Sequence, residues 1–218
     1  MKSKLQIGVI GLGKFGFGFG QSLTSLGHEI LGIDNDVEKI KMTQNTFTQV
    51  IQADATNRET LEQIRINDLE HVLISVGDSI AASAMIAMYL KELGVPRIWA
   101  KAIHKDHEKL LLEIGVNEVF IPEYMAAKQI ATRIAMPGFV EYLQFDSSMA
   151  VREFTVKKWA GKTLREIDIT NKHRVQVIAT KNNGQKKYKY IPIADDIFQK
   201  GDKFVVIGTI NQLSVLSP

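Results

Sequence analysis

The sequence of 218 residues contains no cysteine. Disulfide bonds, thiolate metal sites and cysteine nucleophiles are therefore excluded, and this composition is typical of proteins in a reducing compartment. Long apolar runs are also missing, since none reaches the roughly 20 residues that a membrane-spanning helix needs. Residues 1–4 lead directly into an apolar segment, so we expect no signal peptide and a cytoplasmic protein that meets a membrane only at its periphery.

A strong excess of one charge is absent as well. The net charge is only +3, and the lysines are scattered apart from a small cluster at Lys186, Lys187 and Lys189. A nucleic-acid partner normally requires a clustered basic surface, so we expect none. About 45% of the residues are hydrophobic, which is enough to bury a sizeable core without cross-links.

The first part of the chain alternates short apolar segments with helical ones. We expect six strands, at Gln6–Ile10, Glu29–Ile33, Thr48–Ala53, His71–Val76, Ile98–Lys101 and Glu118–Ile121. Helices are expected between them, at Phe15–Leu26, Val37–Gln44, Arg58–Ile66, Ile80–Leu93 and Lys105–Ile114. This alternation predicts an α/β fold with a Rossmann-like, doubly wound parallel sheet.

The pattern changes after Pro122. A helix is expected over Glu123–Met136, ended by Pro137-Gly138. Short strands and helices follow, with strands expected at Val140–Phe145, Val151–Val156, Val175–Thr180, Lys187–Tyr190 and Lys203–Ile207 and helices at Thr163–Ile167 and Gln212–Leu216. We therefore divide the chain into a Rossmann-like domain over 1–123, a linking helix over 124–138 and a small α+β domain over 139–218.

A glycine-rich motif lies between the first strand and the first helix. Gly11, Gly13 and Gly16 fit G-x-G-x-x-G, with Lys14 and Phe15 between the last two glycines. The first glycine permits a tight turn, the second lets a phosphate approach the backbone, and the third allows close helix–strand packing. The helix N-terminus then attracts the phosphate. The alternative is a plain glycine-rich turn.

Carboxylates follow the second and third strands. Asp34 stands where a carboxylate can accept both ribose hydroxyls and repel a 2′-phosphate, which favours NAD, ATP, ADP or AMP over NADP. Its alternative role is a helix N-cap, which Asp36 can also provide. Asp54 either contacts the adenine edge or begins a turn. The remaining candidates for the nucleotide site adjoin strand ends and are Asn35, Ala55, Ser75 and Val76.

Two charged residues follow the last strands of the sheet. Lys101 ends the fifth strand and is suited to a β- or γ-phosphate, while Glu123 follows the sixth. A carboxylate beside phosphate needs a bridging cation, so Glu123 indicates Mg²⁺ or Ca²⁺. The alternatives are a surface lysine at a strand end and a carboxylate stabilised by the start of a helix.

Taken together, these motifs resemble the nucleotide-binding subunit of Ktr- and Trk-type potassium transporters, the RCK (regulator of potassium conductance) family. The matching segments run nearly from end to end and are Val9–Gly16, Gly32–Asp36, Ala53–Thr56, Lys91–Pro96, Ala100–Ala102, Ile114-Gly115, Ile121–Glu123, Gly161–Leu164, Gly201-Asp202 and Val205–Gly208. The resemblance implies an RCK N-domain, a crossover helix that pairs subunits, and an RCK C-domain.

The resemblance also implies a function. Such subunits form an octameric ring under a membrane potassium channel subunit, at the inner face of the cell membrane, and ATP and ADP hold different ring shapes. By this likeness Asp34 holds the ribose, Lys101 approaches the phosphates and Glu123 belongs to a divalent-ion site. One departure stands out: Lys14 replaces the usual arginine, which keeps the charge but loses the bidentate fork.

The same resemblance suggests a second ligand, cyclic di-AMP, in the C-terminal domain. The corresponding residues are Ile169, Thr170, Val175, Gln176, Val177 and Pro192. Relatives that bind this ligand tend to carry arginine where this chain has Thr170, so charge from Lys172, His173 or Arg174 would have to compensate. The alternative is that the apolar members of this set are core positions.

Other functions have weaker signals. His104, His107 and Glu108 share one helical face, which would suit a metal ion, but a solvated helix face is the more ordinary interpretation. A small NAD-dependent oxidoreductase or NAD(H)-dependent redox sensor is the main alternative function. The sequence offers no convincing catalytic residues for such an enzyme, because His173 is the only histidine after residue 138. A sensing module for another membrane-bound or DNA-bound partner is a third alternative.

Overall fold

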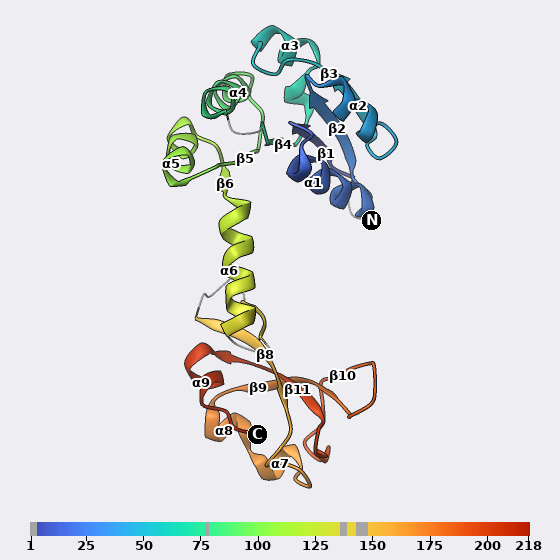
Figure 1. Cartoon of the computed structure of the whole chain (residues 1–218), viewed down its shortest axis with the longest axis vertical. Coiled ribbons are helices and arrows are strands. Elements are labelled where there is room, and N and C mark those ends of the chain that lie inside the picture. The colour runs from blue at the N-terminus through green and yellow to red at the C-terminus, as the bar shows by residue number, and fades with distance from the viewer. Residues whose placement is uncertain (1–3, 77–78, 136–138, 143–147) are drawn as a thin grey trace. The chain divides into compact units, whose positions relative to one another are not determined.

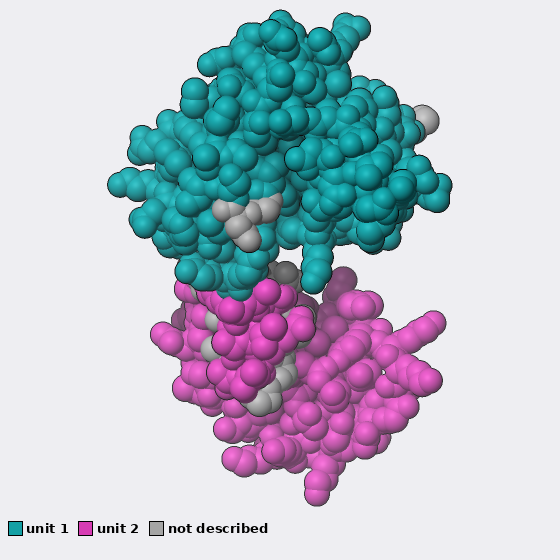
Figure 2. Space-filling view, turned by 45° about the horizontal axis from the view of Figure 1, so that its top comes forward, with its two compact units in different colours: residues 1–125 teal, residues 126–218 magenta. Residues whose placement is uncertain are grey.

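The computed structural model describes residues 4–76, 79–135, 139–142 and 148–218 (Figure 1). It divides into two compact units, Met1–Met125 and Ala126–Pro218, which Figure 2 colours separately. The helix α6 (Pro122–Ala135) begins in the first unit and continues in the second. The predicted helix stop at Pro137-Gly138 lies outside the described residues. The domain boundaries predicted from the sequence stay predictions.

Unit 1 contains a six-stranded sheet in the order β3-β2-β1-β4-β5-β6. Every neighbouring pair is parallel, which confirms the doubly wound α/β fold. Its strands are β1 (Gln6–Ile10), β2 (Glu29–Asp34), β3 (Gln49–Gln52), β4 (His71–Ile74), β5 (Ile98–Lys101) and β6 (Glu118–Phe120). Its helices are α1 (Lys14–Ser25), α2 (Val37–Thr43), α3 (Arg58–Gln63), α4 (Ile80–Glu92) and α5 (Lys105–Ile114).

Both faces of this sheet are buried. Successive side chains of a strand point to opposite faces, so Ile7 and Val9 pack with residues of α1 and α2. Ile10 belongs to the other core, together with residues of α3, α4 and α5. Since helices cover both faces, polar ligands are left with the loops at the carboxyl ends of the strands.

One predicted helix of unit 1 is divided. The helix expected over Arg58–Ile66 ends at Gln63, and a separate 3₁₀ helix, η1, covers Ile66–Asp68. Arg65 lies between them with φ of 56°, in the left-handed region. An α-helix cannot pass through a residue in that conformation, so the helix stops before it.

Unit 2 contains an antiparallel sheet in the order β10-β9-β11-β8-β7, next to a core centred on the fully buried Phe204. The strands are β7 (Phe139–Tyr142), β8 (Met149–Thr155), β9 (Gln176–Lys181), β10 (Lys189–Tyr190) and β11 (Lys203–Thr209). The helices that begin in this unit are α7 (Leu164–Ile167), α8 (Ile169–His173) and α9 (Ile210–Ser214). This arrangement confirms the small α+β domain.

The short helices of unit 2 differ from the prediction. Helix α8 was not expected, and it lies between Asp168 and Arg174, which both adopt left-handed backbone angles. Helix α9 begins two residues earlier than predicted, because Thr209 and Gln212 form a capping box at its start. Among the described residues, no helix combines the length and the apolar character required to cross a bilayer.

Candidate functional site

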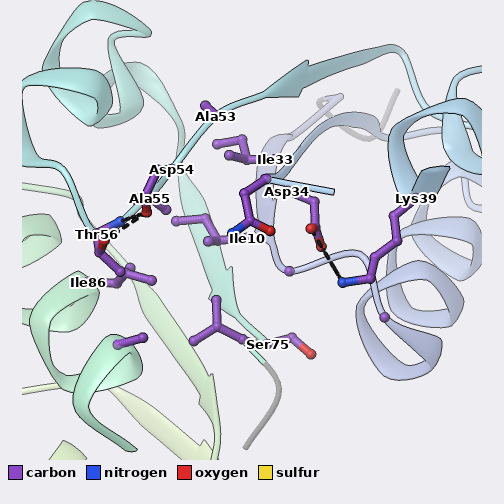
Figure 3. Close-up of a pocket in the computed structure, with 15 residues that line it drawn as sticks. Ile10, Ile33, Asp34, Lys39, Ala53, Asp54, Ala55, Thr56, Ser75 and Ile86 are labelled. Carbon is purple, nitrogen blue, oxygen red and sulfur yellow. Dashed lines mark hydrogen bonds and ion pairs between the residues drawn. The ribbon is translucent and has the colours of Figure 1, made fainter. Parts of the chain in front are cut away.

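A cleft of about 270 Å³ opens in unit 1 where the strands β1, β2, β3 and β4 end (Figure 3). Eight of the residues that the sequence analysis assigned to a nucleotide line it. They are Gly11, Gly13, Asp34, Asn35, Asp54, Ala55, Ser75 and Val76. The other lining residues were not predicted, and they are Ile10, Ile33, Lys39, Ala53, Thr56, Ala82 and Ile86.

The glycine turn is held by close backbone contacts. Gly11 has φ of 91°, and a Cβ added to it would overlap the carbonyl oxygen of Ser75. A Cβ on Gly16 would overlap the carbonyl oxygen of Gly11, so α1 packs directly on the turn. Gly13 differs from both, because no atom lies within 4 Å of the position of its Cβ. The open side of Gly13 faces the cleft, where a ligand can approach the backbone.

Helix α1 begins at this open position. Its N-cap residue is Gly13, and no side chain caps the N–H groups of its first turn. Uncapped N–H groups at the start of a helix carry partial positive charge and bind anions. Lys14, the next residue, is exposed, while the half-buried ring of Phe15 packs on Phe120 at 5.3 Å between centroids. Neither of these two side chains lines the cleft.

Asp34 is the buried acid of the cleft, with 7% of its surface exposed. Its Oδ2 accepts a hydrogen bond from the backbone N–H of Leu12 at 2.7 Å, within the glycine turn. Its Oδ1 accepts from the N–H of Asp36 at 2.9 Å. The ammonium of Lys39 lies 3.3 Å from Oδ2, and Figure 3 marks an interaction between the two side chains by a dashed line. The carboxylate therefore joins the ends of β1 and β2 and the helix α2.

The two roles considered for Asp34 are thus separated by the structure. Asp36 is the N-cap of α2, since its side chain accepts a hydrogen bond from the N–H of Glu38. Asp34 is therefore not needed as the cap of this helix. Ser79 similarly caps α4 through the N–H of Ala82.

Asp54 lies on the opposite side of the cleft and begins a turn. Its Oδ1 accepts hydrogen bonds from the N–H of Thr56 at 2.9 Å and from its hydroxyl at 2.7 Å. These two bonds hold the pKa of the Asp54 carboxyl below its usual range. The side chain is therefore ionised and oriented at the mouth of the cleft.

Lys101 and Glu123 do not line the cleft but form an ion pair. The Lys101 Nζ lies 2.8 Å from Oε1 of Glu123, which is in the first turn of α6. This contact lowers the pKa of the Glu123 carboxyl, and a backbone hydrogen bond lowers it further. Strand β5 is two positions from β1 in the sheet, which corresponds to about 10 Å at the usual strand spacing.

The histidines considered for a metal are used differently. His107 is buried, so the expected solvated helix face is wrong at this position. Its Nε2 lies 2.7 Å from the hydroxyl oxygen of Ser83 on α4, and its Nδ1 accepts from the N–H of Ile103. His104 is the N-cap of α5. No group of three histidine, cysteine, aspartate or glutamate side chains suited to a metal occurs in the described part of the chain.

Unit 2 has an open depression of about 610 Å³. Thr170, Val175 and Gln176 line it, and so does Arg174. Ile169 and Val177 belong to the hydrophobic core of the unit, as the alternative interpretation expected, and Val175 belongs to both. The amide oxygen of Gln176 already accepts a hydrogen bond from the Thr170 hydroxyl at 3.3 Å. Pro192 is not among the lining residues.

Comparison with known proteins follows the same two-part division. Residues 7–122 match the TrkA-N domain and residues 151–217 match the TrkA-C domain. The chain is 31% identical over 212 residues to the "Ktr system potassium uptake protein C" of Bacillus subtilis (strain 168), covering 97% of this chain and 95% of that protein.

Solved structures with a similar fold include two of the protein GsuK. The "GsuK channel bound to NAD" has a TM-score of 0.55 and 18% identity, covering 98% of this chain and 38% of that chain. GsuK bound to ADP has a TM-score of 0.53 and 16% identity, covering 61% of this chain and 35% of that one. The chain thus spans less than half of these longer proteins, and this likeness concerns the fold. The two domain matches and the nearly end-to-end similarity establish that the chain belongs to the family of Ktr- and Trk-type potassium uptake proteins with TrkA-N and TrkA-C domains.

Proposed function

We propose that this chain is the cytosolic gating subunit of a Ktr/Trk-type potassium uptake system and that an adenine nucleotide in the cleft of unit 1 controls a membrane channel subunit. The observation that carries the proposal is the buried Asp34 carboxylate beside the glycine turn, on the cleft wall, at the carboxyl end of β2. In this arrangement the ribose hydroxyls bind Asp34 and the phosphates lie at the start of α1. The role is regulatory rather than enzymatic.

We favour ATP and ADP as the nucleotides, with Lys101 near the terminal phosphates. Lys101 is 18% exposed in its side chain and would exchange Glu123 for a phosphate oxygen, since both offer a negative charge. The freed Glu123 carboxylate fits Mg²⁺ or Ca²⁺ only together with phosphate oxygens and water, because a single carboxylate is too few ligands for either ion. The cation would neutralise charge between carboxylate and phosphate.

NAD or NADH is the second candidate ligand. A related fold is described as a channel bound to NAD, and an acidic residue at the Asp34 position suits the adenosine ribose of either nucleotide. This ligand is compatible with a gating subunit and also with a redox sensor or oxidoreductase. Binding of NAD alone therefore does not distinguish a gating role from an enzymatic one.

We further propose that the chain works as a homo-oligomer, a dimer that builds an octameric ring peripheral to the membrane. Apart from the buried Thr132, the described residues in the second half of α6 are exposed, and one side of the helix is apolar. Ile130 and Ile134, four residues apart, are 58% and 76% exposed. A helix with such a side normally packs against another element, here the same helix of a second copy. Light scattering that finds a stable monomer with and without nucleotide would contradict this assembly.

Cyclic di-AMP is proposed as a second ligand, in the depression of unit 2. Arg174, in a left-handed conformation, lies at this depression and offers the positive charge that Thr170 lacks. We expect calorimetry on the full chain to give a dissociation constant below about 10 μM, weakened by Arg174→Ala because a charge-assisted bond to phosphate is lost. If no heat of binding is measured at high ligand concentration, cyclic di-AMP is not a ligand of this chain.

The gating proposal is tested first by nucleotide binding. Purified protein is titrated with ATP, ADP, NAD and NADH, and the same titrations are repeated with Asp34→Asn, which keeps the size of the side chain. Because a charged acceptor is lost, the affinity for every adenosine nucleotide should fall by about tenfold or more. Glu38→Gln is the matched control, because Glu38 pairs with Lys41 and does not line the cleft. Unchanged affinity in a folded Asp34→Asn protein would contradict the proposal.

A further inference from the structure

All the acceptor positions of the Asp34 carboxylate are already in use. An ionised carboxylate offers about four lone-pair sites. Oδ2 accepts from the backbone N–H of Leu12 and from Lys39, and Oδ1 accepts from the N–H of Asp36 and from Lys39 again. A ribose diol must donate two hydrogen bonds to the same carboxylate. One of the present donors therefore has to leave when a ribose binds.

Lys39 is the donor that can leave. Its contacts are the longest, at 3.3 and 3.4 Å, whereas the backbone donors lie at 2.7 and 2.9 Å and belong to fixed turns. Its side chain is 39% exposed and has four flexible methylenes, so the ammonium can move without becoming a buried unpaired charge. Oδ2 of Asp36, 3.9 Å away, offers a second partner.

Lys39 also lines the cleft, with its ammonium directed at Asp34 in Figure 3. Once displaced, the ammonium is left beside the ribose. Asp34 keeps its two backbone hydrogen bonds and remains satisfied. Because the ammonium lies against both oxygens of Asp34, a phosphate on the ribose hydroxyl that this carboxylate would bind also has a positive charge within reach, which changes the expectation from Asp34 alone.

We propose that Lys39 is a specificity-determining residue at the ribose end of the cleft. It competes with an unmodified ribose diol for Asp34, and it provides the cation for a phosphate carried on the ribose 2′-oxygen. The cleft therefore accepts 2′-phosphorylated adenosine nucleotides, which an isolated aspartate would repel. This inference rests on the proposed nucleotide site.

A matched pair of ligands isolates this contact. ADP-ribose and 2′-phospho-ADP-ribose differ only in the 2′-phosphate, and both are titrated into the full chain by calorimetry, with ADP as the reference. Lys39→Met keeps the aliphatic part of the side chain and removes the charge. We expect this variant to bind ADP-ribose up to about fivefold more tightly, because the competing ion pair with Asp34 is half-exposed and therefore weak. It should weaken the 2′-phosphorylated ligand by at least about tenfold.

Two further variants serve as controls. Lys39→Arg keeps the charge and should preserve the wild-type ratio of the two affinities. Lys41→Met removes a charge from the same helix, but Lys41 pairs with Glu38 and does not line the cleft, so both affinities should stay unchanged.

The outcomes separate this inference from the proposed function. If ADP binds the wild-type protein but Lys39→Met shifts both ligands equally or not at all, Lys39 is not a specificity residue and the nucleotide site stands. If Lys41→Met changes the two affinities as much as Lys39→Met does, the change comes from the overall charge of the helix, and the inference is also overturned. If neither ADP nor ADP-ribose binds the wild-type protein, the proposed nucleotide site fails and this inference fails with it.

Discussion

The two units of this protein place polar groups in different ways. Unit 1 has a parallel sheet with helices on both faces, and the polar groups of its candidate site lie where the strands end, around the cleft. The acid in that cleft, Asp34, is buried and accepts hydrogen bonds from two backbone turns. Unit 2 has an antiparallel sheet, and its depression is lined by side chains such as Thr170 and Gln176 that bond to each other.

This difference teaches where rigidity comes from. The cleft of unit 1 is shaped by backbone contacts between glycines and strand ends, which tolerate few substitutions. The depression of unit 2 is lined by side chains of α8 and of the strands β8, β9 and β11, so its surface depends on side chains more than the cleft of unit 1 does. We therefore expect the position of a ligand in unit 1 to be set by the backbone turn, with Lys39 as the adjustable side chain beside it.

The largest expected effect tests whether the units unfold separately. Phe204 is fully buried and packs on Phe154, Trp159 and Phe198. Phe204→Ala should destabilise unit 2 by about 3–5 kcal/mol, because it leaves a cavity in an aromatic core. ADP binding in unit 1 should persist.

Each unit contains one of the two tryptophans, Trp99 in unit 1 and Trp159 in unit 2. Denaturant unfolding is therefore followed by fluorescence in Trp99→Phe and Trp159→Phe backgrounds. Phe204→Ala should move only the transition reported by Trp159. Equal movement of both transitions would mean that the units unfold as one.

A second prediction concerns the backbone contacts of the glycine turn. Gly16→Ala should destabilise unit 1 by about 3 kcal/mol, because its Cβ would overlap the carbonyl oxygen of Gly11. Gly18→Ala is the control in the same helix, since nothing lies within 4 Å of its Cβ position. It should stabilise the protein by up to about 1 kcal/mol, because alanine favours a helix interior. Effects of the same sign in thermal unfolding would refute the close contact.

The third prediction examines the ion pair at the phosphate end of the proposed site. Lys101→Met should lower the affinity for ATP by about tenfold, because a charge-assisted contact to phosphate is lost. The affinity for adenosine, which has no phosphate, should stay unchanged. Glu123→Gln should remove any tightening of ATP by Mg²⁺. Calorimetry with and without the cation measures both. If the cation has the same effect on the wild-type and Glu123→Gln proteins, Glu123 is only part of an ion pair at the start of a helix.

The smallest expected effect is a pH dependence confined to unit 1. Burial, and then the nearby His104, lower the pKa of His107 in the folded protein. The unfolded chain therefore takes up a proton first, and stability falls as the pH drops below the unfolded value of about 6.5. The loss stops once the folded form is protonated as well.

Circular dichroism between pH 5 and 7.5 can follow this change without the fluorescence of Trp99, whose indole donates to His71. His107→Gln should flatten the dependence of the unfolding free energy on pH. His173→Gln, in unit 2, is the control and should leave it as it is. A slope that survives in His107→Gln would show that another group is responsible.

Local signals in the sequence were sufficient for most of the fold. The alternation of apolar segments and helices predicted the parallel sheet, and the strands Gln6–Ile10 and Ile98–Lys101 have their predicted bounds. Gly27, Gly94 and Gly115, each just past a helix, adopt left-handed angles, which glycine commonly takes at that position. These features depend on neighbouring residues, which is why one sequence is enough to predict them. Helix α8 was missed because it is shorter than two turns and lies between two residues with left-handed backbone angles, Asp168 and Arg174, which are not glycines.

The sequence by itself determined the glycine turn, the acid at the end of β2 and the two-part architecture, since periodicity and turn chemistry are local properties. Only the tertiary structure decided the partners of each charge. It joined Lys39 to Asp34 across a helical turn, paired Lys101 with Glu123, and buried His107 against Ser83. Two of these pairs join elements far apart in the chain, and the third, Lys39 with Asp34, joins a strand end to the helix that follows it. All three depend on how the helices pack on the sheet, which the local sequence pattern does not contain.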